Sequence, residues 1–364
     1  MKCLRRTAPE AILGMLAQAA SSLTFAGVVV VSDWLEHQGW PAFAMLGVAC
    51  VIMTLGLLVQ LCSQSQVQWP TSSSQKVWLF ARGFSSVFSL GGFVVATVFG
   101  CPAGDALVMG STNVLASAVA GCLLFGEAFG KWKVAAVLAT MAGAVLVAKP
   151  EFLFTSVKDQ PYLGYFFASV GGLGLSGLIV CCRKLGKEVS PLVSSLSASA
   201  QRGAMTLLLA ALPLWNRDLA TSVEILGHHP GLAALWVLIL VVLVAMQTVL
   251  VSVGSAMAPA STSGVIVTCC DILFGYVGQI VVMGIMPDGV TLAGVALILG
   301  SVYMVTMDTV SAGTRMEAGT STEEACSKSD INIPGMKDED SSPKKKASQH
   351  ACCSHWLAWW VQLF

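Results

Sequence analysis

The sequence predicts an all-α integral membrane protein whose ten transmembrane helices form two inverted five-helix repeats. Three observations carry this prediction: a composition too apolar for water, ten apolar runs of spanning length, and a gap-free match between the two halves. Hydrophobic residues make up 55% of the 364 residues, charged residues make up 11%, and the mean hydropathy is +0.76. A soluble domain carries about 25% charged residues, so lipid must be the solvent of this chain.

Each apolar run is long enough to cross a hydrocarbon core of about 30 Å. The runs cover residues 11–31, 41–62, 77–99, 103–126, 133–149, 162–182, 191–214, 232–256, 260–283 and 289–308. Several contain Gly, Ser or Thr, which weaken a helix in water. In lipid the backbone must satisfy its own hydrogen bonds, so we expect all ten runs to be helical.

Basic residues predict the orientation of these spans. With a cytosolic N-terminus, nine Lys and Arg residues precede or connect the spans on the cytosolic side, and three lie on the opposite side. The nine are Lys2, Arg5, Arg6, Lys76, Lys131, Lys133, Arg183, Lys184 and Lys187, and the three are Lys149, Lys158 and Arg217. The positive-inside rule therefore places both termini in the cytosol and favours an even number of spans.

An internal repeat relates spans four and five to spans nine and ten. At an offset of 157 residues, Pro102 falls on Pro259, and Gly143 falls on Gly300. Five spans separate the two copies, and an odd number inverts the second copy, which is a common plan of secondary transporters. Small residues spaced by four (Ala135, Ala139 and Gly143, then Ala296 and Gly300) predict faces on which helices approach closely.

The repeat defines the predicted domain organisation. Residues 1–10 form a cytosolic N-terminus, residues 11–149 the first five-helix repeat, and residues 162–308 the second. Residues 311–364 differ in composition, because Ser, Thr, Glu, Asp and Lys dominate up to about residue 350. Such a segment buries too little apolar surface to fold, so we expect a disordered cytosolic tail with an apolar end.

The stretch from Arg82 to Glu127 resembles the EamA-type repeat of the drug/metabolite transporter superfamily, and within it the G-type members of solute carrier family 35. The resemblance rests on Arg82 opening span three, on Pro102–Ala106 opening span four, and on Gly126-Glu127 closing it before a basic loop. Residues 258–284 are similar to the second copy of that repeat, although Gly284 stands where the closing Gly-Glu is expected. The resemblance implies ten helices and solute transport or exchange.

Ionised residues deep inside spans are the first candidates for a binding site. Arg202 and Asp271 each lie about 16 Å into the bilayer, counted from Pro191 and Pro259. Asn113 lies equally deep, almost at the repeat equivalent of Asp271. We predict that these three residues line a central solute cavity, and the alternative is a structural ion pair between Arg202 and Asp271.

Three further residues are candidates for substrate binding. Arg82 lies about two turns from the cytosolic edge, where its side chain can also snorkel to lipid phosphate. Gln247 and Gln279 either line the cavity or hold helices together through hydrogen bonds.

The residues favour a secondary transporter that moves a small organic solute by alternating access, with its site at the midplane between the repeats. Arg202 suits an anionic or zwitterionic solute, and Asp271 is an alternative coupling site for a proton or cation. The alternative function is a non-transporting membrane scaffold that recruits partners through its cytosolic tail.

Other functional classes lack the residues they need. All five histidines lie outside the spans, and no paired carboxylates lie deep enough for acid–base catalysis, so we expect no enzyme. No P-loop (GxxxxGK followed by Ser or Thr) and no C-x-x-C pair is present, so we expect neither ATP-driven pumping nor a zinc site, and no cofactor. A net charge of zero argues against nucleic-acid binding. The sequence leaves open which membrane holds the protein (plasma membrane, or Golgi or ER), and whether it forms a homodimer.

The inverted repeat makes one geometric prediction. Spans four and nine, which are repeat mates, must run in opposite directions across the membrane. A structure in which residues 103–126 and 260–283 run the same way contradicts the repeat.

Overall fold

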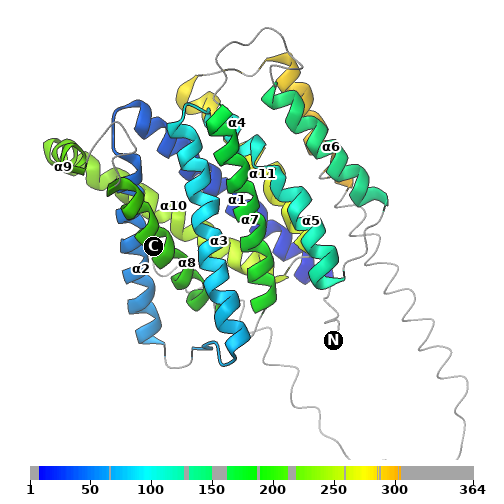
Figure 1. Ribbon diagram of the computed structural model, residues 1–364, viewed down its shortest axis with the longest axis horizontal. Helices are drawn as coiled ribbons and strands as arrows, with labels where there is room; N and C mark the ends of the chain where they lie inside the picture. Colours follow the sequence, from blue (N-terminus) through cyan, green and yellow to red (C-terminus); the bar gives the residue numbers. More distant parts are fainter. Residues whose placement is uncertain are drawn as a thin grey trace, which may run out of the picture. The chain divides into compact units, whose positions relative to one another are not determined.

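The computed structural model describes residues 8–64, 67–126, 131–149, 162–186, 189–211, 219–257, 260–284, 286, 288–301 and 303–304. Residues Met1–Gly313 form one compact unit, and its regular elements are the helices drawn in Figure 1. The predicted tail at 311–364, Glu127 and Pro259 lie outside the described residues.

Every predicted span corresponds to helical structure. The helices are α1 (Ala8–His37), α2 (Ala42–Ser63), α3 (Ser73–Val98), α4 (Ala103–Met109), α5 (Thr112–Phe125), α6 (Lys131–Ala148), α7 (Tyr162–Leu185), α8 (Pro191–Ala211), α9 (Leu219–His228), α10 (Pro230–Met257), α11 (Ala260–Met283) and a further apolar helix over Gly289–Ser301. The short helix α9 is not predicted from the sequence, and span four is divided into α4 and α5.

Seven spans within the described ranges are long and apolar enough to cross a membrane, which supports a multi-pass membrane protein. The apolar stretches Val134–Leu146 of α6 and Gly289–Ser301 are shorter. Helix α8 is full length but more polar, because it contains four serines, Gln201 and Arg202. The three remaining predicted spans are therefore helices that are too short or too polar to qualify by hydropathy alone.

The break in span four lies at Gly110 and Ser111. The N–H groups of Ser111 and Asn113 donate at 2.9 Å to the carbonyls of Val108 and Gly110, three residues back. This tighter pattern interrupts the α-helix for one turn. A Cβ at Gly110 would lie 2.5 Å from Cζ of Phe93, so the neighbouring α3 leaves room only for glycine there.

Glycines let α7 pack directly on the backbone of α3. A Cβ added to Gly92 would lie 2.7 Å from the backbone of Gly171, and a Cβ added to Gly174 would lie 2.5 Å from the backbone nitrogen of Ser89. Contacts such as these, on helices that run antiparallel, are typical of membrane helices that associate through small residues.

Two other helix pairs have the same antiparallel order. Helix α1 is joined to α10, where Gln18 donates to Ser255 at 2.7 Å. Helix α2 is joined to α8, where Thr54 donates to Ser199 at 3.0 Å. Side-chain hydrogen bonds therefore link helices that lie far apart in the sequence.

Spans four and nine are neighbours that run in opposite directions. Gly104, at the start of α4, meets Gln279 near the end of α11, and Asn113 in α5 meets Gly264 near the start of α11. The predicted opposite directions of these two spans are therefore confirmed. The last helix pairs with α6 in the same antiparallel way, because Thr140 bonds Ser301 at 2.6 Å.

The predicted small-residue face is right at Gly143 and wrong at Ala296 and Gly300, and Ala135 on α6 is exposed as well. A Cβ at Gly143 would lie 2.6 Å from Ile298 and 2.7 Å from the Gly294 carbonyl oxygen. Ala296 and Gly300 are exposed, and a Cβ added to Gly300 would meet no heavy atom within 4 Å. The helix presents a neighbouring face to α6 instead, and the buried residues of that face are Thr291, Gly294, Ile298 and Ser301.

Asp288 fixes the start of the last helix and joins it to the end of α6. Its Oδ1 accepts hydrogen bonds from the backbone N–H and the hydroxyl of Thr291 at 3.0 and 2.7 Å, which is a standard N-cap arrangement. The ammonium of Lys149 forms an ion pair with the same carboxylate. The hydrogen bonds from Lys149 and Thr291 lower the pKa of Asp288 below its ordinary value.

The close approach of α3 and α7 yields a stability prediction. Replacing Gly92 with Ala places a methyl group against the Gly171 backbone, so we expect a loss of about 1–3 kcal/mol in the free energy of unfolding. The adjacent Gly91→Ala is the matched control, because its Cβ would meet no atom within 4 Å. Thermal unfolding of the purified protein in detergent measures both variants. Equal midpoints for the two variants would contradict the packing argument.

Candidate functional site

Arg82 is fully buried where α3, α7, α8 and α10 meet. Its Nε donates to Sγ of Cys182 at 2.8 Å, and its two terminal nitrogens donate to the carbonyl of Ser194 and the hydroxyl of Ser252. The side chain is 0% exposed, so it does not snorkel toward the membrane edge, which was one of the two possibilities that the sequence left open. Three helices supply acceptors that hold the guanidinium inside the protein.

Arg202 is also buried, but its guanidinium is only partly bonded. Its Nη1 donates to Oε1 of Gln247 at 3.0 Å and to Oγ1 of Thr248 at 3.1 Å, both on α10. Its Nε and Nη2 have no hydrogen-bond partner among the described residues, although the residue is only 1% exposed. Buried donors normally have partners, so two unpartnered donors on one charged group mark this side chain as unusual.

A polar stripe on α10 connects the two arginines. Thr248 lies one turn before Ser252, and the Ser252 hydroxyl donates to the Thr248 carbonyl at 2.5 Å. Arg202 bonds the Thr248 side chain and Arg82 bonds the Ser252 side chain. The hydroxyls of Ser195 and Ser252 lie 3.3 Å apart. The group that we call the arginine cluster consists of Arg82, Ser195, Arg202, Gln247, Thr248 and Ser252.

The arginine cluster carries two positive charges, and no carboxylate within the described ranges is in contact with them. The ion pairs that the structure describes are Asp33–His37, Lys149–Asp288 and Glu224–His228, and none of these involves the cluster. In a medium of low dielectric constant, positive charge without a counter-charge attracts an anion strongly. The cluster is therefore suited chemically to a carboxylate or phosphate group.

Asp271 does not pair with Arg202, contrary to the alternative that the sequence suggested. Asp271 lies on α11 beside Ser22 of α1, whereas Arg202 bonds only α10 through its side chain in the described structure. Helix α11 packs mainly on α1, α4, α5 and α7, whereas α8 packs mainly on α2, α3 and α10. Matching depth along two helices is a poor guide to proximity, because these two helices have different main neighbours.

Asn113 belongs to a third group of contacts. Its amide donates to the Gly264 carbonyl at 3.3 Å and to the Thr268 hydroxyl at 2.9 Å, and its carbonyl accepts from Ser117 at 2.8 Å. Ser117 in turn reaches Ser176 of α7 at 3.1 Å. These bonds join α5 to α11 and α7, so the three residues predicted to share one cavity lie in separate networks in this conformation.

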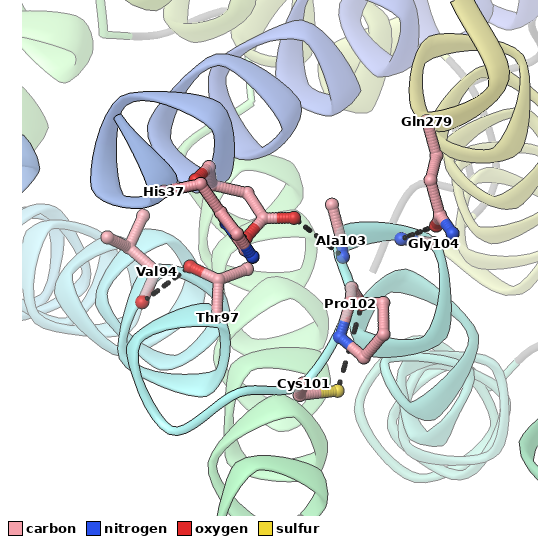
Figure 2. A network of polar contacts seen from close by, with 9 residues as sticks. His37, Val94, Thr97, Cys101, Pro102, Ala103, Gly104 and Gln279 are labelled. Atoms are coloured by element: carbon pink, nitrogen blue, oxygen red, sulfur yellow. Dashed lines mark hydrogen bonds and ion pairs between the residues drawn. The ribbon is translucent and has the colours of Figure 1, made fainter. Parts of the chain in front are cut away.

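The two glutamines hold helices together here. Gln247 accepts from Arg202, and Gln279 accepts from the backbone N–H of Gly104 at 3.0 Å. Figure 2 shows this second contact at the start of α4, where the N–H of Ala103 also donates to Oδ2 of Asp33 at 3.2 Å. Asp33 and Gln279 thus satisfy two of the N–H groups that a helix start leaves free.

Sequence reasoning missed Ser195, Thr248 and Ser252 of the cluster, and it also missed Asp33. A signal for Thr248 and Ser252 exists, since they lie four residues apart on one face of the largely apolar α10. The predicted first span ends at residue 31 and leaves Asp33 in a loop, whereas α1 continues to His37. The side chain of Asp33 is 1% exposed.

Other kinds of site find little support in the described ranges. No group of three or more His, Cys, Asp or Glu residues there is arranged to hold a metal ion. A surface hollow of about 610 Å³ is lined by Val67, Gln68, Trp69, Thr71 and Gln75 between α2 and α3, and none of the six candidate residues lines it.

Comparison with known proteins supports the fold and goes no further. No protein-family model matches the chain, and no curated protein matches it. A solved structure described only as "Crystal structure of protein" superposes with a TM-score of 0.53 at 18% sequence identity, covering 82% of this chain and 97% of the other. At that identity the likeness shows a shared fold alone. The fold and the comparisons together define an all-helical protein with helices suited to crossing a membrane.

The different bonding of the two arginines yields a second prediction. Lys carries its charge on one nitrogen and cannot reach three acceptors on three helices, so Arg82→Lys should lower the free energy of unfolding by about 1–3 kcal/mol. Arg202→Lys should cost less, because a single ammonium can bond both Gln247 and Thr248. Thermal midpoints of the two variants in detergent test this difference. A larger loss for Arg202→Lys would show that its free donors have a structural role.

Proposed function

We propose that this protein is a secondary transporter that moves a small organic solute across a membrane by alternating access. The observation that carries the proposal is the arginine cluster, which holds two buried guanidinium groups without a described carboxylate in contact. A charged side chain at the centre of a bilayer costs at least about 2.5–3.5 kcal/mol, so such residues ordinarily serve a substrate or ion pathway.

The chemistry of the cluster favours an anionic or zwitterionic solute. Arg82 is held by three acceptors, which keeps its charge in place, whereas Arg202 keeps Nε and Nη2 available. Two parallel N–H donors of one guanidinium match the two oxygens of a carboxylate or phosphate. Hydroxyls of Ser195, Thr248 and Ser252 are suited to orient the remaining polar groups of the solute.

Helix pairing supports the inverted repeat that alternating access requires. In an inverted repeat each of spans one to five has a mate among spans six to ten, so α1 corresponds to α7 and α3 corresponds to α10. The pair α1–α10 therefore corresponds to the pair α7–α3, and both pairs are closely packed. The same correspondence maps α2–α8 onto itself, and likewise the contact of α4 and α5 with α11. Transporters of this plan bind substrate between the repeats and use interrupted helices near the site. Span four, which is divided into α4 and α5, is an interrupted helix of this kind.

The resemblance to the EamA-type repeat is consistent with this function. We also propose that both termini are cytosolic, from the distribution of Lys and Arg. The scaffold function remains the competing proposal, because it requires only the tail and no solute site.

Uptake into proteoliposomes tests the proposal. The solutes are radiolabelled succinate, glutamate and glucose 6-phosphate, with glucose as the neutral reference. We expect uptake of at least one anionic or zwitterionic compound, and we expect Arg202→Gln to reduce it about tenfold to a hundredfold, the value of a charged hydrogen bond.

Lys184→Gln is the matched control. It removes one positive charge from α7 at a half-buried position outside the arginine cluster, where the ammonium bonds the Leu124 carbonyl, and it should leave uptake unchanged. A truncation that lacks residues 311–364 should also retain uptake. Absence of uptake for every solute, with correctly folded protein, would favour the scaffold.

A further inference from the structure

Asp271 is a buried acid with few hydrogen-bonding partners among the described residues. The residue is 2% exposed and lies near the middle of α11. The hydroxyl of Ser22 on α1 is its hydrogen-bonding neighbour, while its Oδ1 has no partner among the described residues. The Ser22 hydroxyl also donates to the carbonyl of Val267 at 3.1 Å, so even this donor is shared.

No cationic side chain among the described residues lies where it would balance the negative charge of an ionised Asp271. Helices α5 and α10 contain no Asp, Glu, Lys or Arg. On α4 the acid Asp105 accepts from Tyr276, and on α7 the bases Arg183 and Lys184 lie at Phe125, the last residue of α5.

The remaining titratable groups of α1 and α11 supply no cation beside Asp271 either. Asp33 and His37 pair with each other at the far end of α1, and Asp33 lies eleven residues, or about 16 Å, beyond Ser22. Glu36 is on the same turn as Asp33 and His37. The thiols of Cys269 and Cys270 precede Asp271 on α11 itself. A charged carboxylate at this place would therefore be unpaired and poorly hydrated.

We propose that Asp271 is the proton-binding site that couples solute movement to a proton gradient. In the conformation described here the carboxyl group is neutral and holds the proton. When the site opens to one aqueous phase, the O–H bond breaks, the proton passes to water, and the electron pair stays on the carboxylate. When the site opens to the other phase, the carboxylate takes a proton from hydronium, so charge and atoms balance over the cycle.

The geometry favours a proton over a metal cation. A Na⁺ or Mg²⁺ ion requires several oxygen ligands, whereas Asp271 has one neighbouring hydroxyl that is already bonded to a backbone carbonyl. A proton requires one oxygen only. The location on α11, in contact with α1 and α5, places the residue where a rocking movement between spans of the two halves would change its access to water.

This inference rests on the proposed transport function, so the experiment separates the two. Proteoliposomes that contain the full chain are tested for counterflow exchange and for accumulation driven by an imposed pH gradient, with succinate, glutamate and glucose 6-phosphate as probes. We expect Asp271→Asn to keep exchange and lose gradient-driven accumulation, because the amide mimics the neutral acid but cannot release a proton.

Asp105→Asn is the matched control, since it neutralises an acid that has a hydrogen-bond partner on the same helix as Asp271. It should keep both activities. Exchange without any pH-driven accumulation in the unmodified protein would overturn the proton site while leaving the transport function intact. Normal pH-driven accumulation by the Asp271→Asn variant would likewise overturn the proton site and leave the transport function intact.

Infrared spectroscopy provides a readout that does not need a substrate. The unmodified protein in lipid nanodiscs should show a protonated-carboxyl band near neutral pH that is missing in Asp271→Asn and present in Asp105→Asn. If all exchange is absent, the transport proposal fails, and this band alone then decides whether Asp271 holds a proton. An unchanged band in Asp271→Asn would overturn the inference.

Discussion

The interior of this protein is organised around guanidinium groups that must be kept away from lipid. Two arginines on different helices are buried, and each obtains hydrogen bonds from α10. The serines that make α8 a weak membrane span by hydropathy let it take part in the same cluster. Close packing brings the acceptors into reach, because the glycines of α7 let its backbone touch α3 and place Cys182 at Nε of Arg82. A small shift of α7 would therefore leave a buried charge without one of its partners.

Span four shows how a membrane helix is interrupted without losing its backbone bonds. Gly110 packs against the ring of Phe93, and the N–H groups of Ser111 and Asn113 donate to the carbonyls three residues earlier in the chain. At the other end of α4, Asp33 and Gln279 accept from the first N–H groups (Figure 2). The seven-residue α4 is therefore a separate helical element whose two ends are both held by hydrogen bonds.

The sequence by itself determined that the apolar runs are helical and that spans four and nine run in opposite directions. Apolar runs of spanning length must be helical in lipid, and the repeat predicted that spans four and nine oppose each other, as the contacts Gly104–Gln279 and Asn113–Gly264 show. The sequence also identified Arg202, Asp271 and Asn113 as polar groups in an apolar setting.

Only the tertiary structure decided which of these groups meet. Depth along a helix is a linear property that can be counted from the sequence, whereas the direction in which a side chain points depends on the rotation and neighbours of the helix. The sequence therefore left open whether Arg82 faces the interior or lipid phosphate and predicted Arg202 close to Asp271, whereas Arg82 lies inside and Arg202 bonds Gln247. Hydrophobicity varies little around α10 and α11, so the sequence contains little information about the rotation of these helices, and close packing decides it.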